Sequence, residues 1–200
     1  VFSQTQGFRH GSISDGHSAI SKLAASHSIE VDSTESSDVF TDEGLAKYDA
    51  VMFLNTTGDV LNEQQQIAFQ RYIQGGGGYI GVRSASDTEY GWPWYGQLVG
   101  AYFVDHPAIQ EARLVVDDSR HPSTAHLDDE WVRSDEWYNH RFVNDNLNVL
   151  LSIDKQSYDA GTDTFEGATQ PMSWYHSFDG GRSFYTNMGH RPETWLETDF

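Results

Sequence analysis

Residues Gly75–Tyr90, which read GGGGYIGVRSASDTEY, contain the strand that decides the expected fold. Their glycines end a helix-like segment, and the apolar run Tyr79–Val82 then has the length and composition of a buried strand. Polar and charged residues begin directly after this run, at Arg83. Ligands of open α/β sheets bind beyond the carboxyl ends of the strands. The stretch therefore predicts a buried strand with part of a functional site at its end.

The chain before this stretch alternates between expected strands and expected helices. Strands are expected at Val1–Ser3, Ile29–Val31 and Ala50–Leu54, and helical segments over residues 15–26, 41–48 and 62–74. Short connections between such elements are typical of right-handed crossovers in a parallel sheet. We therefore expect an α/β fold with a parallel sheet flanked by helices. Because Val1–Ser3 reads as the end of a first strand, the chain is expected to have been trimmed from a longer one.

The second half of the chain is richer in strand-forming residues. A short helix is expected from Trp92 to Gly100, and the turn Asp179-Gly180-Gly181 predicts a hairpin. Further strands are expected at 102–104, 112–116, 131–137, 149–153 and 172–178. These features predict an antiparallel extension of the parallel sheet, within one domain that spans residues 1–200.

Charge and composition exclude several classes of function. The 30 acidic residues against 12 lysines and arginines give a net charge of −18, which disfavours nucleic acids and anionic membranes as partners. This acidity fits an extracellular protein slightly better than a cytoplasmic one. The absence of cysteine excludes disulfides, thiolate zinc sites and cysteine nucleophiles. No apolar run approaches the ~20 residues of a membrane span, and no feature of the sequence sets an oligomeric state.

Polar residues that follow the expected strands should meet at the carboxyl edge of the sheet. The candidate catalytic residues are His10, Arg83, Asp87, Glu136 and His190. The candidate substrate-binding residues are Arg9, Asn55, Thr56, Ser84, Trp92, Trp94, Tyr95, Trp137 and Tyr138. Aromatic walls with a few hydrogen-bonding groups suit a sugar, whose ring faces stack and whose hydroxyls need partners. A sugar or oligosaccharide is therefore the expected substrate.

Each of these residues also has a purely structural interpretation. Arg83 can pair with a nearby acid, Asp87 can cap a turn, and the Trp92–Trp94 segment can be core packing. A divalent metal is a candidate cofactor, although no H-E-x-x-H spacing exists. Its candidate ligands are His10, His106 and His190, with Asp87 or Glu136.

A Ser84–His190–Glu193 triad is also conceivable, but the sequence around Ser84, GVRSA, lacks the G-x-S-x-G pattern of a nucleophile elbow.

Several of these segments together resemble the ThuA-like (trehalose utilisation) family, which is related in fold to class I glutamine amidotransferases. The resembling segments are VFSQTQGFRH, YDAVMFLNTTGDVLNEQQQIAFQRYIQGGGGYIGV, SASDTEYGWPWYGQLVGAYF, DHP, DEWYN and GGRSFYTNMGH, which together cover nearly the whole chain. The resemblance implies a flavodoxin-like sheet. It also implies that the turn after YIGV stands where amidotransferases carry a cysteine nucleophile. Because such family members lack that cysteine, as this chain does, glutamine hydrolysis is not implied.

The chain departs from the family pattern at this turn. Family members commonly read G-[IV]-H there, whereas this chain has Gly81-Val82-Arg83. The change removes a candidate base or metal ligand. It favours a fixed cation that binds a carboxylate, an enolate or a sugar oxygen.

Two main functions are compatible with these residues. The first is a carbohydrate-active enzyme for a glycoside or an oxidised (keto or uronic) sugar. His10 or His190 would remove a proton next to a carbonyl, as a lyase, a keto-glycoside hydrolase or an isomerase requires. Arg83 would stabilise the enolate, and Glu136 or Asp87 would act as acid or orient the base. The second is a non-catalytic carbohydrate-binding or accessory domain of a larger secreted protein. A metal-dependent hydrolase is a third candidate.

Overall fold

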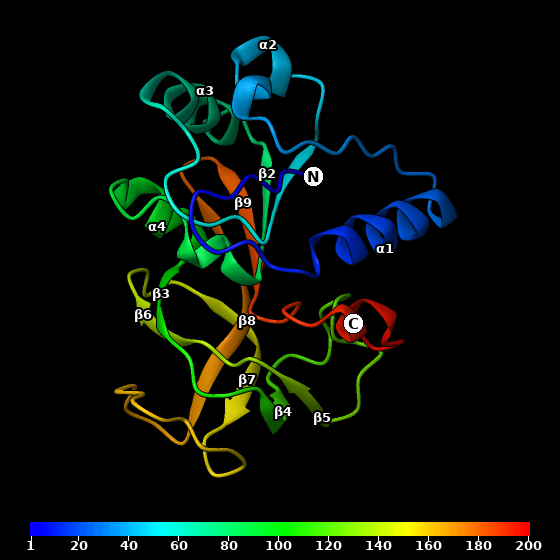
Figure 1. The fold of residues 1–200 in the computed structure, drawn as a ribbon, viewed down its shortest axis with the longest axis vertical. Coiled ribbons are helices and arrows are strands. Elements are labelled where there is room, and N and C mark those ends of the chain that lie inside the picture. The colour runs from blue at the N-terminus through cyan, green and yellow to red at the C-terminus, as the bar shows by residue number, and fades with distance from the viewer.

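One seven-stranded sheet runs through the molecule, in the strand order β1-β2-β9-β8-β7-β4-β5 (Figure 1). The computed structural model describes all residues from Val1 to Phe200. The strands of the sheet are β1 (Ala50–Leu54), β2 (Gly78–Val82), β4 (Gln110–Val116), β5 (Glu130–Asp135), β7 (Asn148–Asp154), β8 (Thr169–Phe178) and β9 (Gly181–Thr186). Strands β3 (Ala101–Asp105) and β6 (Asn139–Phe142) form a separate antiparallel pair.

Helices occupy mainly the first half of the chain. The α-helices are α1 (Ile13–Ser26), α2 (Asp42–Leu45), α3 (Glu63–Gln74) and α4 (Pro93–Val99), and the 3₁₀ helices are η1 (Ser37–Val39), η2 (Arg83–Asp87) and η3 (Pro192–Leu196). Helix α3 begins at a capping box, in which Asn62 Oδ1 accepts from the Gln65 amide at 3.0 Å and Gln65 Oε1 accepts from the Asn62 amide at 2.9 Å. None of the helices has the length and apolarity needed to span a lipid bilayer.

The sheet is mixed, and only part of it is parallel. Strands β1, β2 and β9 run parallel, and the others pair antiparallel with their neighbours. The expected antiparallel extension is therefore confirmed. The hairpin at Asp179-Gly180 was also expected, but its second strand returns to the parallel part and lies beside β2. Because Leu54, Val82 and Thr186 share one register, the chain leaves all three parallel strands at the same edge.

Two strands expected near the amino terminus are not formed. Ile29–Val31 lies in irregular chain, and Ile29 is 60% exposed, so this segment lacks the apolar cover that stabilises a strand. Val1–Ser3 contributes only isolated parallel bridges, which join Phe2 to Phe53 and to Thr34. The parallel part of the sheet is consequently narrower than the sequence predicts.

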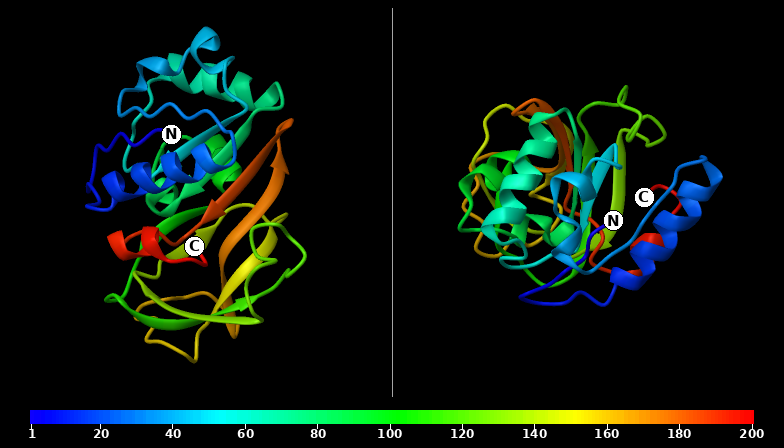
Figure 2. Two further views of the ribbon diagram at one scale, coloured as in Figure 1. Left: turned by 90° about the vertical axis from the view of Figure 1, so that its right-hand side faces the viewer. Right: turned by 90° about the horizontal axis from the view of Figure 1, so that it is seen from above.

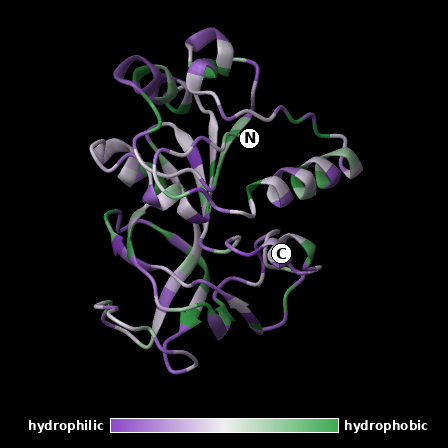
Figure 3. Cartoon of the chain, viewed as in Figure 1, coloured by the Kyte–Doolittle hydropathy of each residue, from purple (hydrophilic) through white to green (hydrophobic).

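Helices cover both faces of the parallel strands, with α3 on one side and α1 on the other (Figure 2). On the α3 and α4 side, aromatic rings form the larger core, where Phe53 contacts Phe69 and Tyr95. A smaller core lies under the antiparallel strands and includes Leu114, Trp137 and Ile153. Hydrophobic segments concentrate in the sheet strands, and many connecting loops are hydrophilic (Figure 3). These two cores hold the strand ends that carry the polar residues described next.

Replacing Gly96 with alanine should destabilise the protein. A Cβ at Gly96 would lie 2.4 Å from the ring of Tyr102, which is buried in β3. Overpacking of this kind costs about 1–3 kcal/mol, and it opposes the roughly 1 kcal/mol that alanine gains over glycine in a helix. Urea denaturation of Gly96→Ala should therefore give a lower free energy of unfolding. Gly91→Ala is the matched control, because a Cβ there meets nothing within 4 Å; equal stability of the two variants would contradict this packing.

Candidate active site

The chain turns sharply where β2 ends. Val82 is extended, whereas Arg83 has a φ of 57°, a left-handed conformation that non-glycine residues rarely adopt. Tyr185 holds this turn, because its hydroxyl donates to the Arg83 carbonyl at 2.7 Å. The same hydroxyl lies 2.9 Å from Ser86 Oγ and 3.3 Å from His140 Nε2. A buried hydrogen-bond network therefore fixes the residue that follows the central strand.

The side chain of Arg83 is entirely buried and is turned toward Glu136. Its guanidinium donates to the Glu136 carboxylate and to the Glu136 carbonyl, and it lies 3.5 Å from the Asn187 carbonyl. The ring of Tyr138 stacks on it, with Arg83 Cζ 3.4 Å from the ring centroid. The sequence left two roles open for this cation, an ion pair with a nearby acid and the binding of a substrate oxygen. Its 0% exposure and its contacts favour the ion pair, in which it holds Glu136 in place.

Glu136 is the centre of the polar cluster at this edge. One of its carboxylate oxygens lies 3.2 Å from His190 Nδ1, and the other lies 3.3 Å from His106 Nδ1. The contact with His190 does not have the geometry of a hydrogen bond. Burial alone would raise the pKa of Glu136, but the contacts with His190 and Arg83 outweigh it and hold the pKa below its usual range. Glu136 is therefore a carboxylate at neutral pH.

A second buried ion pair fixes the backbone around Glu136. Asp135 is fully buried and accepts from the Glu136 amide at 2.9 Å and from the Gly189 amide at 3.1 Å. Arg133 donates to Asp135 at 2.8 Å and to Glu197 at 2.9 Å. The segments that carry Glu136 and His190 are thus bound to one carboxylate.

His10 lies behind His190 in the same cluster. Its ring centroid is 5.1 Å from that of His190, edge to face, and its Nδ1 is 3.4 Å from Ser84 Oγ. Burial, and then the nearby Arg83 and His190, lower the pKa of His10 from 6.5 to about 3. His10 is therefore neutral at physiological pH and can accept or donate one hydrogen bond at each nitrogen.

Asn55 lines the site from the end of β1. It has a φ of 52°, and its Nδ2 donates to Ser12 Oγ at 3.2 Å. Ser12 in turn donates to the Gly189 carbonyl at 2.9 Å, so it holds the His190 loop and does not cap α1. Asn55 Oδ1 is buried and has no hydrogen-bond partner. The carboxyl edge of the sheet thus brings together His10, Asn55, Arg83, Ser84, Glu136, Tyr138 and His190, with His106 beside them.

Other predicted site residues make their contacts elsewhere. Arg9 forms an exposed ion pair with Glu35 at 2.7 Å, and Thr56 is buried against Thr88 at 2.9 Å. Asp87 accepts from Tyr90 at 2.7 Å, and burial raises its pKa.

The predicted tryptophans also lie apart from the cluster. Trp94 donates to Asp179 at 2.8 Å, in the turn before β9 and thus at the opposite edge of the sheet, and Trp92 stacks on Trp94. Tyr95 is fully buried in the larger core and Trp137 in the smaller one, where its Nε1 donates to the Gln110 carbonyl at 3.0 Å. The structural interpretation of these aromatic residues is the one that their contacts support.

The residues that support the cluster from behind were not predicted from the sequence. These are Ser12, Arg133, Asn187, Tyr185 and His140, together with the positioning contacts of Asp135. Alternation along RSDEWYN was the available signal, because it separates Asp135 from Glu136 onto different faces. The others carry no local pattern, since their partners lie far away in the sequence.

His10, Glu136 and His190 also have the composition of a metal site. Each offers one donor atom, and these atoms all lie within 4.8 Å of one another. Neutral imidazoles and a carboxylate suit a divalent ion such as Zn²⁺. The Arg83 guanidinium, however, already binds Glu136 and adds a positive charge to the same site. An ion would therefore compete with Arg83 for the carboxylate.

The pKa of His10 can be measured directly. We expect its imidazole signals in NMR spectra to remain those of the neutral ring down to about pH 4, because its folded pKa is about 3. In concentrated urea the same ring should titrate near 6.5. Between these values the unfolded chain binds a proton that the folded chain does not. The contribution of His10 to stability should therefore fall by up to ~1.4 kcal/mol per pH unit as the pH drops through this interval. A His10 ring that titrates near 6.5 in the folded protein would contradict the described burial.

Comparisons with known proteins agree with this architecture. The chain matches the ThuA family, described as "Trehalose utilisation", over residues 1–200. A putative ThuA-like protein from Bacteroides uniformis has a similar structure, with a TM-score of 0.81 and 24% identity, covering 99% of this chain and 84% of that one. A putative ThuA-like protein from Parabacteroides merdae has a TM-score of 0.76 and 18% identity, covering 94% of this chain and 78% of that one.

The fold also occurs within larger enzymes. A β-galactosidase from Bacillus circulans sp. alkalophilus gives a TM-score of 0.63 with 14% identity, over 97% of this chain but only 29% of that one. This likeness concerns the fold alone. No curated protein sequence matches the chain. The family match over the whole chain shows that this protein belongs to the ThuA, or trehalose utilisation, family.

Proposed function

We propose that this protein is a carbohydrate-active enzyme that uses His190 as a general base on an oxidised (keto or uronic) sugar or its glycoside. The family's link to trehalose utilisation supports a sugar as substrate. The contact that carries the proposal is the one between His190 Nδ1 and Glu136 Oε2, at 3.2 Å. His190 and Glu136 remain partly accessible, whereas Arg83 is not.

The carboxylate of Glu136 beside His190 supports the role of His190 as the base. A carboxylate next to Nδ1 favours the tautomer that carries its proton there, which leaves Nε2 free to accept a proton. When Nε2 becomes protonated, the negative charge of Glu136 stabilises the imidazolium. The proton would leave a carbon next to a carbonyl, and the electron pair of the broken C–H bond would form an enolate. Elimination, hydrolysis of a keto-glycoside and isomerisation all share this first step.

The other residues of the cluster then have distinct tasks. Arg83 orients Glu136 and keeps it charged, so in this proposal it is a positioning residue and does not touch the substrate. His106 is the most exposed member beside Glu136 and is placed to hydrogen-bond a sugar oxygen. His10, buried and neutral, packs on His190 and fixes its ring.

Loss of His190 should remove turnover without removing the fold. A screen of 3-keto sugars, keto-glycosides and uronides by mass spectrometry should find a substrate. On that substrate, the His190→Gln variant should have a kcat about 10²–10⁴-fold lower than that of the wild type. His27→Gln, at an exposed position after α1, is the matched control and should leave kcat unchanged. Unchanged turnover in His190→Gln would rule the mechanism out. Calorimetric binding of these sugars without any product would favour the non-catalytic carbohydrate-binding domain instead.

A metal-dependent hydrolase is the second candidate, and the three donors within 4.8 Å favour it. This candidate makes a different prediction, because an ion that binds only the folded state stabilises it by an amount that grows with the logarithm of the ion concentration divided by Kd. Elemental analysis of the purified protein should then find about one divalent ion per chain, and added Zn²⁺ should raise the Tm of the stripped protein. The Glu136→Gln variant should lose both effects. If Zn²⁺ leaves the Tm unchanged and no ion copurifies, this candidate is eliminated.

A further inference from the structure

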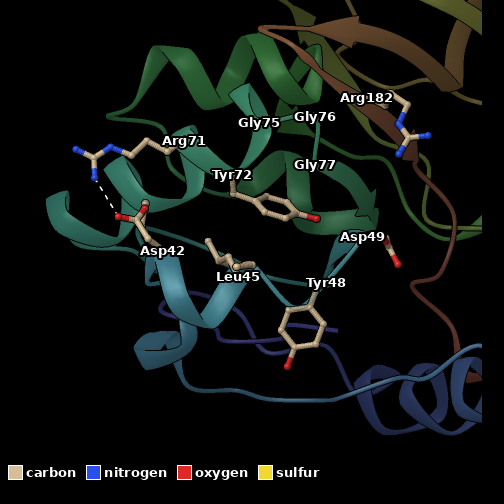
Figure 4. A pocket seen from close by; sticks show the side chains of 12 residues that line it. Asp42, Leu45, Tyr48, Asp49, Arg71, Tyr72, Gly75, Gly76, Gly77 and Arg182 are labelled. Atoms are coloured by element: carbon tan, nitrogen blue, oxygen red, sulfur yellow. Dashed lines mark hydrogen bonds and ion pairs between the residues drawn. The ribbon is translucent and has the colours of Figure 1, made fainter.

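A pocket lies at the opposite edge of the sheet from the Glu136 cluster (Figure 4). It has a volume of about 420 Å³ and opens between α2, the end of α3 and the start of β9. The lining side chains that matter here are Asp42, Asp49, Arg71, Tyr72, Arg182 and Leu45. Ligand pockets commonly have volumes of about 300–1,000 Å³. The cavity is therefore large enough for a small ligand such as a monosaccharide.

The pocket is separate from the candidate active site. Arg182 pairs in register with Gly78 at the amino end of β2, whereas Arg83 follows the carboxyl end of the same strand. Five residues at about 3.3 Å each place roughly 16 Å between the two edges. No residue lines the pocket and also contacts Glu136.

Two opposite charges at the rim of the pocket have no partner within the chain. Arg71 pairs with Asp42 at 3.1 Å, but neither Asp49 nor Arg182 forms an ion pair. Both of these side chains are exposed. In a protein with 30 acidic and 12 basic residues, most of the surface repels anions. The unpaired Arg182 therefore gives this part of the surface a positive charge that can attract an anion.

The inner wall of the pocket includes Leu45 and the ring of Tyr72. Leu45 is buried, and the ring of Tyr72 lies against Gly77, where an added Cβ would be 2.4 Å from the ring. The Tyr72 hydroxyl lies near the Gly78 amide but has no hydrogen bond of good geometry. Figure 4 shows this hydroxyl pointing toward the side of the pocket that carries Asp49. The pocket thus presents the partly exposed ring of Tyr72 next to the charged side chains of its rim.

We propose that this pocket binds a small acidic sugar, a hydroxylated ring that carries a carboxylate. Arg182 would bind the carboxylate, since a guanidinium matches its two oxygens. Asp49 would accept hydrogen bonds from the sugar hydroxyls, as would the Asp42 carboxylate beside Arg71. The apolar face of the sugar ring would lie on Tyr72. The site is independent of the proposed catalytic function and serves binding alone.

Calorimetric titration with D-glucuronate tests this assignment, with D-glucose as the uncharged counterpart. Glucuronate should bind the wild-type protein more tightly than glucose does. Arg182→Gln should weaken glucuronate binding by at least about tenfold, because a charge-assisted hydrogen bond is lost. Arg120→Gln is the matched control, since the Arg120 side chain is 92% exposed in another loop, and it should bind as the wild type does.

The outcomes separate this site from the catalytic one. If Arg182→Gln binds glucuronate as tightly as the wild type, or if the wild type does not bind it, the proposal is overturned. It is also overturned if Glu136→Gln removes the binding and Arg182→Gln does not, because the sugar then lies at the other edge. Turnover of any substrate found for the wild type should be unaffected in Arg182→Gln. A failure of the His190 mechanism would leave the binding result intact.

Discussion

The buried ion pair between Arg83 and Glu136 is the interaction on which the functional edge depends. Removing two charges from water is costly, and attraction in the interior repays the cost only when the geometry is good and further contacts are made. Here the guanidinium donates to both the carboxylate and the carbonyl of Glu136, and Tyr138 covers its face. The pair joins the end of β2 to the segment after β5, which belongs to the other half of the sheet. It therefore connects the parallel and antiparallel parts of the fold at the place where the chemistry is proposed.

Much of the fold could be predicted because its signals are local. The apolar run of β2, its glycine boundary and the capping box of α3 each lie within a few neighbouring residues, and the structure has these elements at the expected places. The position of β9 could not be predicted in this way. Its hairpin with β8 is encoded locally, but its pairing with β2 joins residues about a hundred positions apart. The predicted strand at Ile29–Val31 does not form for the same reason, since only tertiary burial decides whether a short apolar run becomes a strand.

The candidate site shows the same division between local and distant information. The rule that polar residues gather at the carboxyl edge of parallel strands placed His10, Asn55 and Arg83 together without knowledge of any contact. It could not distinguish aromatic residues that bind a sugar from aromatic residues that pack in a core, because Trp94 and Trp137 look the same in the sequence in either role. Asp135 was even harder to assign, because its function depends on the amides of Glu136 and Gly189, which meet only in three dimensions.

Arginine at position 83 has a chemical consequence that a histidine would not have. A guanidinium stays protonated at any physiological pH, so the charge beside Glu136 cannot be switched off by titration. The contacts with His190 and Arg83 together outweigh burial and hold the pKa of Glu136 low, so the carboxylate is a poor proton donor. Proton transfer at this edge is then left to the imidazoles, of which buried His10 is held neutral and His190 retains solvent access. Arginine at this position thus separates two tasks that a histidine could combine, because Arg83 fixes the charge of the cluster and the proposed proton transfer is assigned to another residue, His190.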